Sequence, residues 1–187
     1  MDGLQGVDDE DNDAPVNEFA EVISDEVDPE FNQKDSILFV IDARKAMCHP
    51  AADGGPSFFS QALQCVAACM RDRILNGEHD LVGVLLFGTM KHKVPEGQQG
   101  FPHIYLVQPL EEPSANSMRE LSLICQAEDG DGSAGPATAV ADDFGHMDNT
   151  DPLDFANVLW VSSMMFNSTA SKNMRRRLYI MTNDDNP

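Results

Sequence analysis

The stretch DSILFVIDARKAM, residues 35–47, decides the fold of this chain. Ile37–Ile41 form an unbroken apolar run, which is typical of a strand buried on both faces of a parallel sheet. Asp42 follows this run directly. In an open α/β sheet, the carboxyl end of a central strand faces the ligand crevice. Asp42 is therefore the first candidate for a functional carboxylate.

The net charge limits what this polypeptide can bind on its own. Among 187 residues, 12 are Lys or Arg and 32 are Asp or Glu, so the formal net charge is −20. Such a chain repels phosphate groups at long range. We therefore expect it to bind neither nucleic acid nor an anionic membrane by itself.

The first 33 residues differ in composition from the rest, with twelve acidic side chains and no Lys or Arg. So little apolar area cannot offset the entropy of ordering, which predicts a disordered acidic tail over residues 1–34. The alternative is that this tail has a function, either as an interaction arm or as a shield against loose DNA contacts. An acidic start is also unlike a secretory or mitochondrial leader, and the four cysteines include no CxxC pair, so we expect a reducing compartment.

Residues 35–187 carry the patterns of an α/β domain. Ser57 can cap a helix that ends at Asn76-Gly77. The apolar stripe expected on this helix is Phe59, Leu63, Val66, Met70 and Ile74. A second buried strand is predicted at residues 81–87. No helical pattern separates it from a third strand at 104–107, so the third strand is predicted to be an antiparallel partner at the sheet edge.

The remaining elements are a short helix that ends near Ile124, a flexible acidic loop at residues 126–150, a helix at 151–166 and a fourth strand at 178–181. The third helix is expected to turn six residues inward, namely Leu153, Ala156, Leu159, Trp160, Ser163 and Phe166. The loop contains GDGSAG at residues 130–135. It lacks the strand-to-helix context that a dinucleotide fingerprint needs, so it predicts no nucleotide site.

The cysteines and the basic residues suggest only weak candidate sites. Cys65 and Cys69 lie one helical turn apart, and we interpret them as small core residues rather than metal ligands. His49 next to Cys48 indicates a turn rather than a catalytic dyad. The only basic cluster is Lys172, Arg175, Arg176 and Arg177. It is predicted to be the solvated approach to the fourth strand, and a phosphate contact, a partner contact or an import signal is the alternative.

The order strand–helix–strand–strand–helix–loop–helix–strand resembles the von Willebrand factor A fold. The resemblance implies a doubly wound, mostly parallel sheet with an antiparallel edge strand. That family carries Asp-x-Ser-x-Ser after its first strand, and these residues hold Mg²⁺ with help from later loops. Here the matching positions are Asp42, Arg44 and Ala46, and Asn183 stands at the last ligand position. We therefore expect a degenerate site without a metal, in which Asp42 pairs with Arg44 or accepts local backbone N–H groups.

A narrower resemblance rests on five stretches: DSILFVIDARKAM; Asp80-Leu81 through Phe87-x-Thr89; Ile104-Tyr105 through Leu110-x-x-Pro113-x-Ala115; Val158–Val161 with Phe166; and TNxDNP at residues 182–187. Together they are similar to the α/β domain of the smaller subunit of the Ku DNA-end-binding heterodimer. In that family the sheet continues through two more strands. The chain is thus expected to be a partial domain with an exposed fourth strand, marginal stability and a tendency to aggregate.

The resemblance implies a function without catalysis and without a cofactor. It implies a scaffold domain that acts in double-strand break repair by non-homologous end joining, and in telomere maintenance, in the nucleus. Its expected partners are the second Ku subunit and end-joining accessory proteins, and DNA ends only within the full heterodimer. No GxxxxGK[ST] motif supports an ATPase or helicase activity. The alternative is a metal-independent protein-interaction module of the same fold, unrelated to DNA repair.

Overall fold

A computed structural model describes residues 34–50, 54–94, 100–129, 144–169 and 174–184. All of them belong to one compact unit, Gln33–Pro187. Its elements are, in chain order, β1 (Asp35–Asp42), α1 (Lys45–Cys48), α2 (Phe58–Asn76), β2 (Leu81–Phe87), β3 (Ile104–Glu111), α3 (Ala115–Asp129), α5 (Phe155–Thr169) and β4 (Arg175–Met181).

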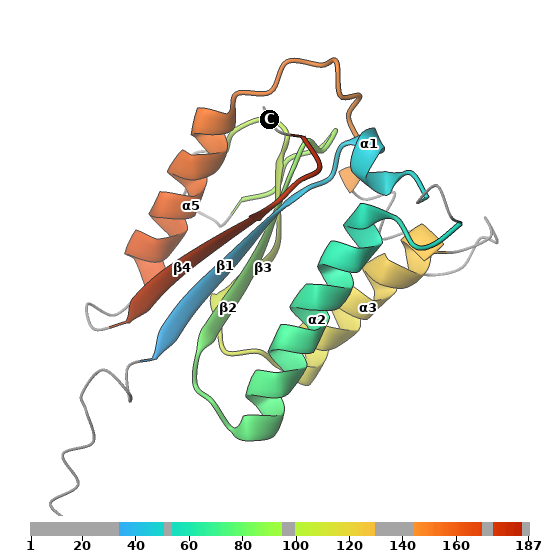
Figure 1. The fold of residues 1–187 in the computed structure, drawn as a ribbon. Helices are drawn as coiled ribbons and strands as arrows, with labels where there is room; N and C mark the ends of the chain where they lie inside the picture. The colour runs from blue at the N-terminus through green and yellow to red at the C-terminus, as the bar shows by residue number, and fades with distance from the viewer. Residues whose placement is uncertain (1–33, 51–53, 95–99, 130–143, 170–173, 185–187) are drawn as a thin grey trace, which may run out of the picture. The chain divides into compact units, whose positions relative to one another are not determined.

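Four strands form one mixed sheet in the order β3-β2-β1-β4 (Figure 1). β1 pairs in parallel with β2 and with β4, so the strand that opens the domain is central. β3 pairs antiparallel with β2 at the edge. The predicted fold class, an α/β domain with a mostly parallel sheet and an antiparallel edge strand, is confirmed.

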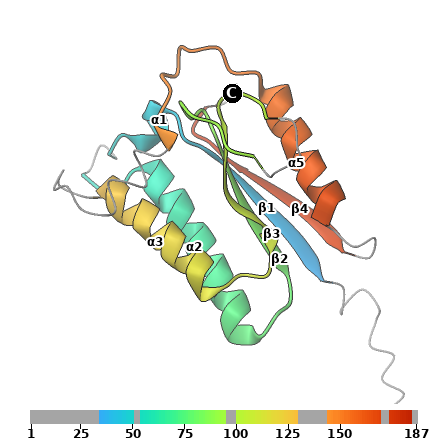
Figure 2. The same ribbon diagram turned by 180° about the vertical axis from the view of Figure 1, so that it is seen from behind.

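Helices cover both faces of the sheet (Figures 1 and 2). α2 lies against one face, where Ile37, Phe39 and Ile41 of β1 belong to a cluster that also contains Phe59 and Leu63. α5 lies against the other face, on a cluster that contains Leu38 and Val40. Since alternate residues of β1 serve opposite faces, the whole run had to be apolar. No helix among the described residues combines the length and apolar character needed to cross a bilayer.

The ends of α2 are where the sequence predicts them. The Ser57 side chain accepts a hydrogen bond from the Ser60 backbone N–H, and Gly77 ends the helix in the left-handed conformation. Most of the expected apolar stripe is buried, but Ile74 is 42% exposed. The prediction for Ile74 is wrong, as is the one that Cys65 is a core residue, because Cys65 is exposed. Cys69 is half-buried against the core.

The face of α5 differs from the prediction. Asp154 accepts a hydrogen bond from the Ala156 N–H, so the helix begins at Phe155 and not at Asp151. Phe166 is buried as expected, but Leu159 and Trp160 are 43% and 59% exposed. Ala156 and Ser163 are exposed too. The residues turned to the sheet are instead Val158, Val161, Ser162, Met165 and Phe166. With apolar residues around much of the helix, periodicity could not identify the buried face.

The acidic loop predicted at 126–150 is shorter in the structure at both ends. α3 extends to Asp129. Beyond the gap in the described residues, Phe144 and Met147 are 1% and 2% exposed. Residues 130–143, which contain the GDGSAG string, lie outside the described residues, as do residues 1–33 of the predicted acidic tail. The C-terminal end of the predicted loop, which contains Phe144 and Met147, therefore belongs to the packed domain.

β4 begins at Arg175, so the arginines belong to the strand itself and the prediction that they precede it is wrong. In the described part of the chain, β4 pairs only with β1. Three large side chains in its middle, Leu178, Tyr179 and Ile180, are 38%, 43% and 42% exposed. An edge strand with apolar side chains exposed on both faces is a template for association with other strands.

We expect Ile180→Lys to slow aggregation of the chain on heating by at least about threefold, since a charge on a free edge opposes strand pairing. Leu75→Lys is the matched control, because Leu75 is 75% exposed but lies near the end of α2, away from the sheet edge. Light scattering at a fixed temperature measures both rates. Equal rates for the two variants would contradict a role for the β4 edge.

Candidate functional site

The carboxyl ends of β1 and β4 meet because the two strands are parallel and pair in register up to Ile41 and Met181. Asp42 and Thr182, which directly follow Ile41 and Met181 in the sequence, are thereby brought together. Asp42 is fully buried and Arg44 is 3% exposed. A carboxylate and a guanidinium thus lie buried at the sheet end that faces the crevice in folds of this class.

Asp42 and Arg44 form a two-pronged ion pair, as the sequence predicts. Arg44 Nη2 donates to Asp42 Oδ2 at 2.7 Å, and Arg44 Nε donates to Asp42 Oδ1 at 3.0 Å. The Arg44 backbone N–H also donates to Asp42 Oδ1 at 2.9 Å. Both expectations for Asp42, a pair with Arg44 and a local backbone donor, are confirmed.

Two residues that the sequence analysis did not assign complete this cluster. Thr182 Oγ1 donates to Asp42 Oδ2 at 2.8 Å, and Asp184 Oδ2 lies 3.1 Å from Arg44 Nη2. The backbone N–H of Asp184 donates to Thr182 Oγ1 at 3.0 Å. Both residues belong to the segment noted above for its resemblance, but nothing in the sequence alone pairs them with Asp42 and Arg44.

Among the described residues, neither Asn183 nor Ala46 forms a hydrogen bond with the Asp42 carboxylate. Asn183 is exposed, and its Nδ2 donates to the Ala46 carbonyl oxygen at 3.3 Å. The Ala46 N–H donates to Asn149 Oδ1 at 2.9 Å. The backbone of Ala46 therefore links the turn after β1 to two later segments, one containing Asn149 and the other Asn183.

The electrostatics of the cluster keep Arg44 charged. The hydrogen bond to Asp42 raises the pKa of the Arg44 guanidinium, and this outweighs burial, which lowers it; Asp184 adds to the rise. The guanidinium also lies over the Phe87 ring, 5.9 Å from its centroid. Two carboxylates and an aromatic face thus surround one cation, a closed arrangement for a buried charge.

Gly88 leaves the space that Arg44 fills. A Cβ atom at Gly88 would lie 2.4 Å from Arg44 Cγ, and the backbone there has φ +74°. The Gly88 carbonyl oxygen accepts from the Met147 N–H at 3.0 Å, and the Met147 carbonyl oxygen accepts from the Lys45 N–H at 2.9 Å. The loop after β2 and the segment around Met147 therefore hold the turn that carries Arg44.

We propose that the Arg44 guanidinium takes the place of a divalent cation at this sheet end. Its donors occupy both oxygens of Asp42, which an approaching cation would need. Among the residues that the structure describes, no group of three or more His, Cys, Asp or Glu side chains is placed to hold a metal ion.

On this basis Mg²⁺ at millimolar concentration is expected to change the thermal unfolding midpoint by less than about 1 °C, since a ligand without a native site gives no stabilisation. Differential scanning fluorimetry with matched NaCl ionic strength measures the shift. A saturable rise of several degrees would show that the site takes a cation after all.

The basic cluster is only partly in the described residues, because Lys172 lies outside them. Arg175 and Arg176 are exposed, and Arg176 Nη1 donates to Asn167 Oδ1 at 3.1 Å. Arg177 Nε lies 2.7 Å from Asp35 Oδ2. A phosphate or partner contact by this cluster remains a prediction, with Arg175 and Arg176 its exposed members.

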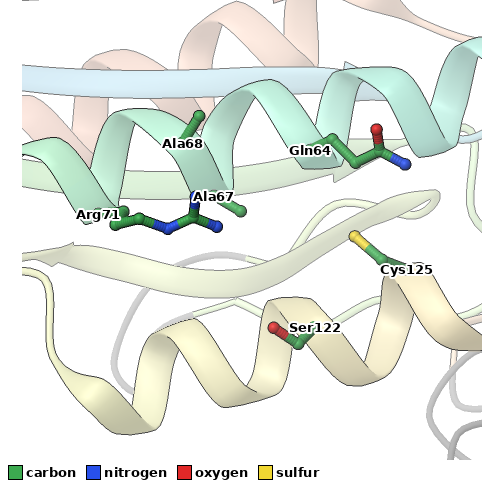
Figure 3. A pocket seen from close by; sticks show the side chains of 6 residues that line it. All are labelled: Gln64, Ala67, Ala68, Arg71, Ser122 and Cys125. Atoms are coloured by element: carbon green, nitrogen blue, oxygen red, sulfur yellow. The ribbon is translucent and has the colours of Figure 1, made fainter.

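A surface pocket of about 440 Å³ lies between α2 and α3 (Figure 3). It is lined by Gln64, Ala67, Ala68, Arg71, Ser122 and Cys125. Its walls offer a single cation and no carboxylate or imidazole, so it has the groups for weak polar contacts and not for acid–base chemistry.

Comparison with known proteins places these features in a family. Residues 36–187 match the family model described as "Ku70/Ku80 N-terminal alpha/beta domain". The chain is 34% identical over 166 residues to "ATP-dependent DNA helicase II subunit 1" of Chaetomium globosum, covering 83% of this chain and 25% of that protein. It is 27% identical over 157 residues to "X-ray repair cross-complementing protein 6" of Mus musculus, covering 84% of this chain and 24% of that protein.

A more distant relative is "ATP-dependent DNA helicase ku70" of Dictyostelium discoideum, at 26% identity over 167 residues, with 84% of this chain and 17% of that protein covered. The chain thus spans about a quarter or less of the length of these relatives. The word helicase in two of these names refers to the full-length proteins.

Proposed function

Because the chain belongs to the family of Ku70/Ku80 N-terminal α/β domains, we propose that it serves as a non-catalytic scaffold of a Ku-type DNA-end-binding protein. The relatives named above are of the smaller-subunit type. This favours the DNA-repair role over the unrelated interaction module considered from the sequence. The domain would act in non-homologous end joining, and in telomere maintenance, inside the nucleus.

The observation that carries the non-catalytic role is the closed site at the end of β1. Every oxygen of the buried Asp42 already accepts hydrogen bonds from Arg44 or Thr182. Catalysis by a carboxylate needs an oxygen that can reach a substrate proton or a metal. Such a fully satisfied buried cluster supports rigidity of the fold instead.

The charge of the chain supports partners that are proteins rather than DNA. A net charge of −20 opposes contact with a phosphate backbone. The second Ku subunit and end-joining accessory proteins are the proposed partners. DNA ends would be held only by the complete heterodimer, in which this domain contributes protein contacts.

The isolated chain is expected to show no end-dependent shift of linear duplex DNA at moderate salt. An electrophoretic assay with a short linear duplex, and a closed circular duplex as control, measures this. The second arm uses a heterodimer whose smaller subunit carries this chain as its N-terminal domain, with and without residues 34–184. Removal of the domain is expected to leave end binding nearly unchanged but to reduce end joining in an extract.

Two results would contradict the proposal. A submicromolar, end-dependent shift by the isolated chain would make it a DNA-binding domain. Loss of end binding by the heterodimer that lacks the domain, with the heterodimer still assembled, would assign it a direct role at the DNA.

A further inference from the structure

A thiol and an imidazole from distant parts of the chain lie side by side near the sheet end. Cys48 Sγ, in the last residue of α1, is 3.3 Å from Nδ1 of His146 and 4.0 Å from its Nε2. His49, the sequence neighbour of Cys48, is exposed, and its backbone N–H caps α1 by donating to the Lys45 carbonyl oxygen. The histidine partner of Cys48 is therefore 98 residues away, where no sequence pattern pairs the two.

The surroundings of His146 decide which ring nitrogen carries hydrogen. Nδ1 lies 2.6 Å from the Ala43 carbonyl oxygen, which can only accept, so Nδ1 is assigned as the donor. The same N–H is within reach of Cys48 Sγ. The ring itself is held by edge-to-face contacts with Phe59 at 5.8 Å and Phe144 at 5.3 Å between centroids. The donor is thereby fixed in place beside the sulfur.

A fixed N–H beside a sulfur favours the thiolate, which is the nucleophilic form of cysteine. A proton that leaves the sulfur can be taken up at Nε2, and the resulting imidazolium would place a positive charge next to the thiolate. Cys48 packs against the core cluster but is only partly buried, so we expect small reagents to reach its sulfur. Nucleophile, donor and access are thus present at one position.

The two cysteines on α2, Cys65 and Cys69, have different surroundings from those of Cys48. Cys65 is exposed, and among the described residues no histidine forms a hydrogen bond with its thiol. Burial raises the pKa of the Cys69 thiol, and this outweighs the lowering by Arg73. Exposure alone would therefore make Cys65 the first of these to react, while the position of His146 favours Cys48.

We propose that Cys48 is a covalent modification site for low-molecular-weight disulfides and other soft electrophiles, activated by His146. With a disulfide, the Cys48 thiolate attacks one sulfur and forms a mixed disulfide, while the S–S bond of the reagent breaks. The departing thiolate takes up a proton, and the reagent is the oxidant. With an α-haloamide, an S–C bond forms and the halide leaves.

The test is pulsed labelling of the folded chain with iodoacetamide and, separately, with glutathione disulfide, followed by peptide mapping by mass spectrometry. Cys65 in the same molecule is the internal reference. Cys48 is expected to react at least about fivefold faster than Cys65 with iodoacetamide at neutral pH, despite its lower exposure. In urea the two rates are expected to converge.

Two matched variants separate activation from access. His146→Gln removes the imidazole and is expected to bring the Cys48 to Cys65 rate ratio down to the value in urea or below it, because Cys48 is the less exposed of the two. His79→Gln removes an exposed histidine that pairs with Glu112 and is expected to leave the ratio unchanged. Far-UV circular dichroism and an unchanged Cys65 rate verify that each variant stays folded.

A wild-type chain in which Cys65 reacts faster than Cys48 would overturn the proposal. So would a folded His146→Gln variant with an unchanged ratio. If His146→Gln does not fold, the ratio of the Cys48 rate to the Cys65 rate in the wild-type chain decides the question. A ratio in the folded chain no greater than the ratio in urea would mean that Cys48 is not activated, and would overturn the proposal.

Discussion

Replacing Asp42 with Ala is expected to lower the free energy of unfolding by about 3–5 kcal/mol, because it leaves a buried guanidinium without its main partner. Arg44 is 3% exposed, and after the change Asp184 would be the one carboxylate among the described residues that still pairs with it. Thr182 would lose its acceptor as well. Loss of this size is a large part of the stability of a small domain, so the variant is expected to unfold at a much lower urea concentration than the parent chain. Circular dichroism during urea titration measures it.

The surface offers a matched control for this experiment. Asp148 pairs with Lys45 Nζ at 2.9 Å, but both side chains are more than half exposed. Asp148→Ala is expected to cost less than about 1 kcal/mol. The double variant Asp42→Ala/Arg44→Met is expected to be more stable than Asp42→Ala alone, since it removes the unpaired charge. A double variant no more stable than the single one would show that the charge is not the cause.

Replacing Gly88 with Ala is expected to cost about 2–5 kcal/mol, because two penalties combine at this position. The backbone has φ +74°, and the new Cβ would meet Arg44 Cγ at 2.4 Å. Arg44 cannot move away freely, since Asp42 holds its Nε and Nη2. Chemical denaturation followed by tryptophan fluorescence, with Trp160 as the sole tryptophan, measures the change.

Gly77→Ala isolates the backbone part of this cost. Gly77 also has a positive φ, +66°, but an added Cβ would meet nothing within 4 Å. Its replacement is expected to cost about 1–2 kcal/mol. Equal losses at Gly77 and Gly88 would mean that contact with Arg44 contributes nothing measurable.

Local patterns in the sequence predicted the order of the four described strands and part of the site, but not the full lengths of β3 and β4. The apolar run Ile37–Ile41 identified the central strand, because a strand buried on both faces needs apolar residues at every position. Ser57 and Gly77 marked the ends of α2 through backbone chemistry that spans only a few residues. Asp42 and Arg44 are two residues apart, so their pairing was also predictable.

The tertiary structure decided everything that depends on distant segments. Thr182 joins Asp42 only because β4 lies parallel to β1 in register, a pairing between segments 140 residues apart. His146 joins Cys48 across 98 residues through a segment with no regular pattern. The buried face of α5 was likewise undecided, because its apolar residues surround the helix and only packing against the sheet selects among them. DSILFVIDARKAM thus determined the central strand and the Asp42 carboxylate. The later segment with Thr182 and Asp184, which lies beside it, supplies the remaining partners of Asp42 and Arg44.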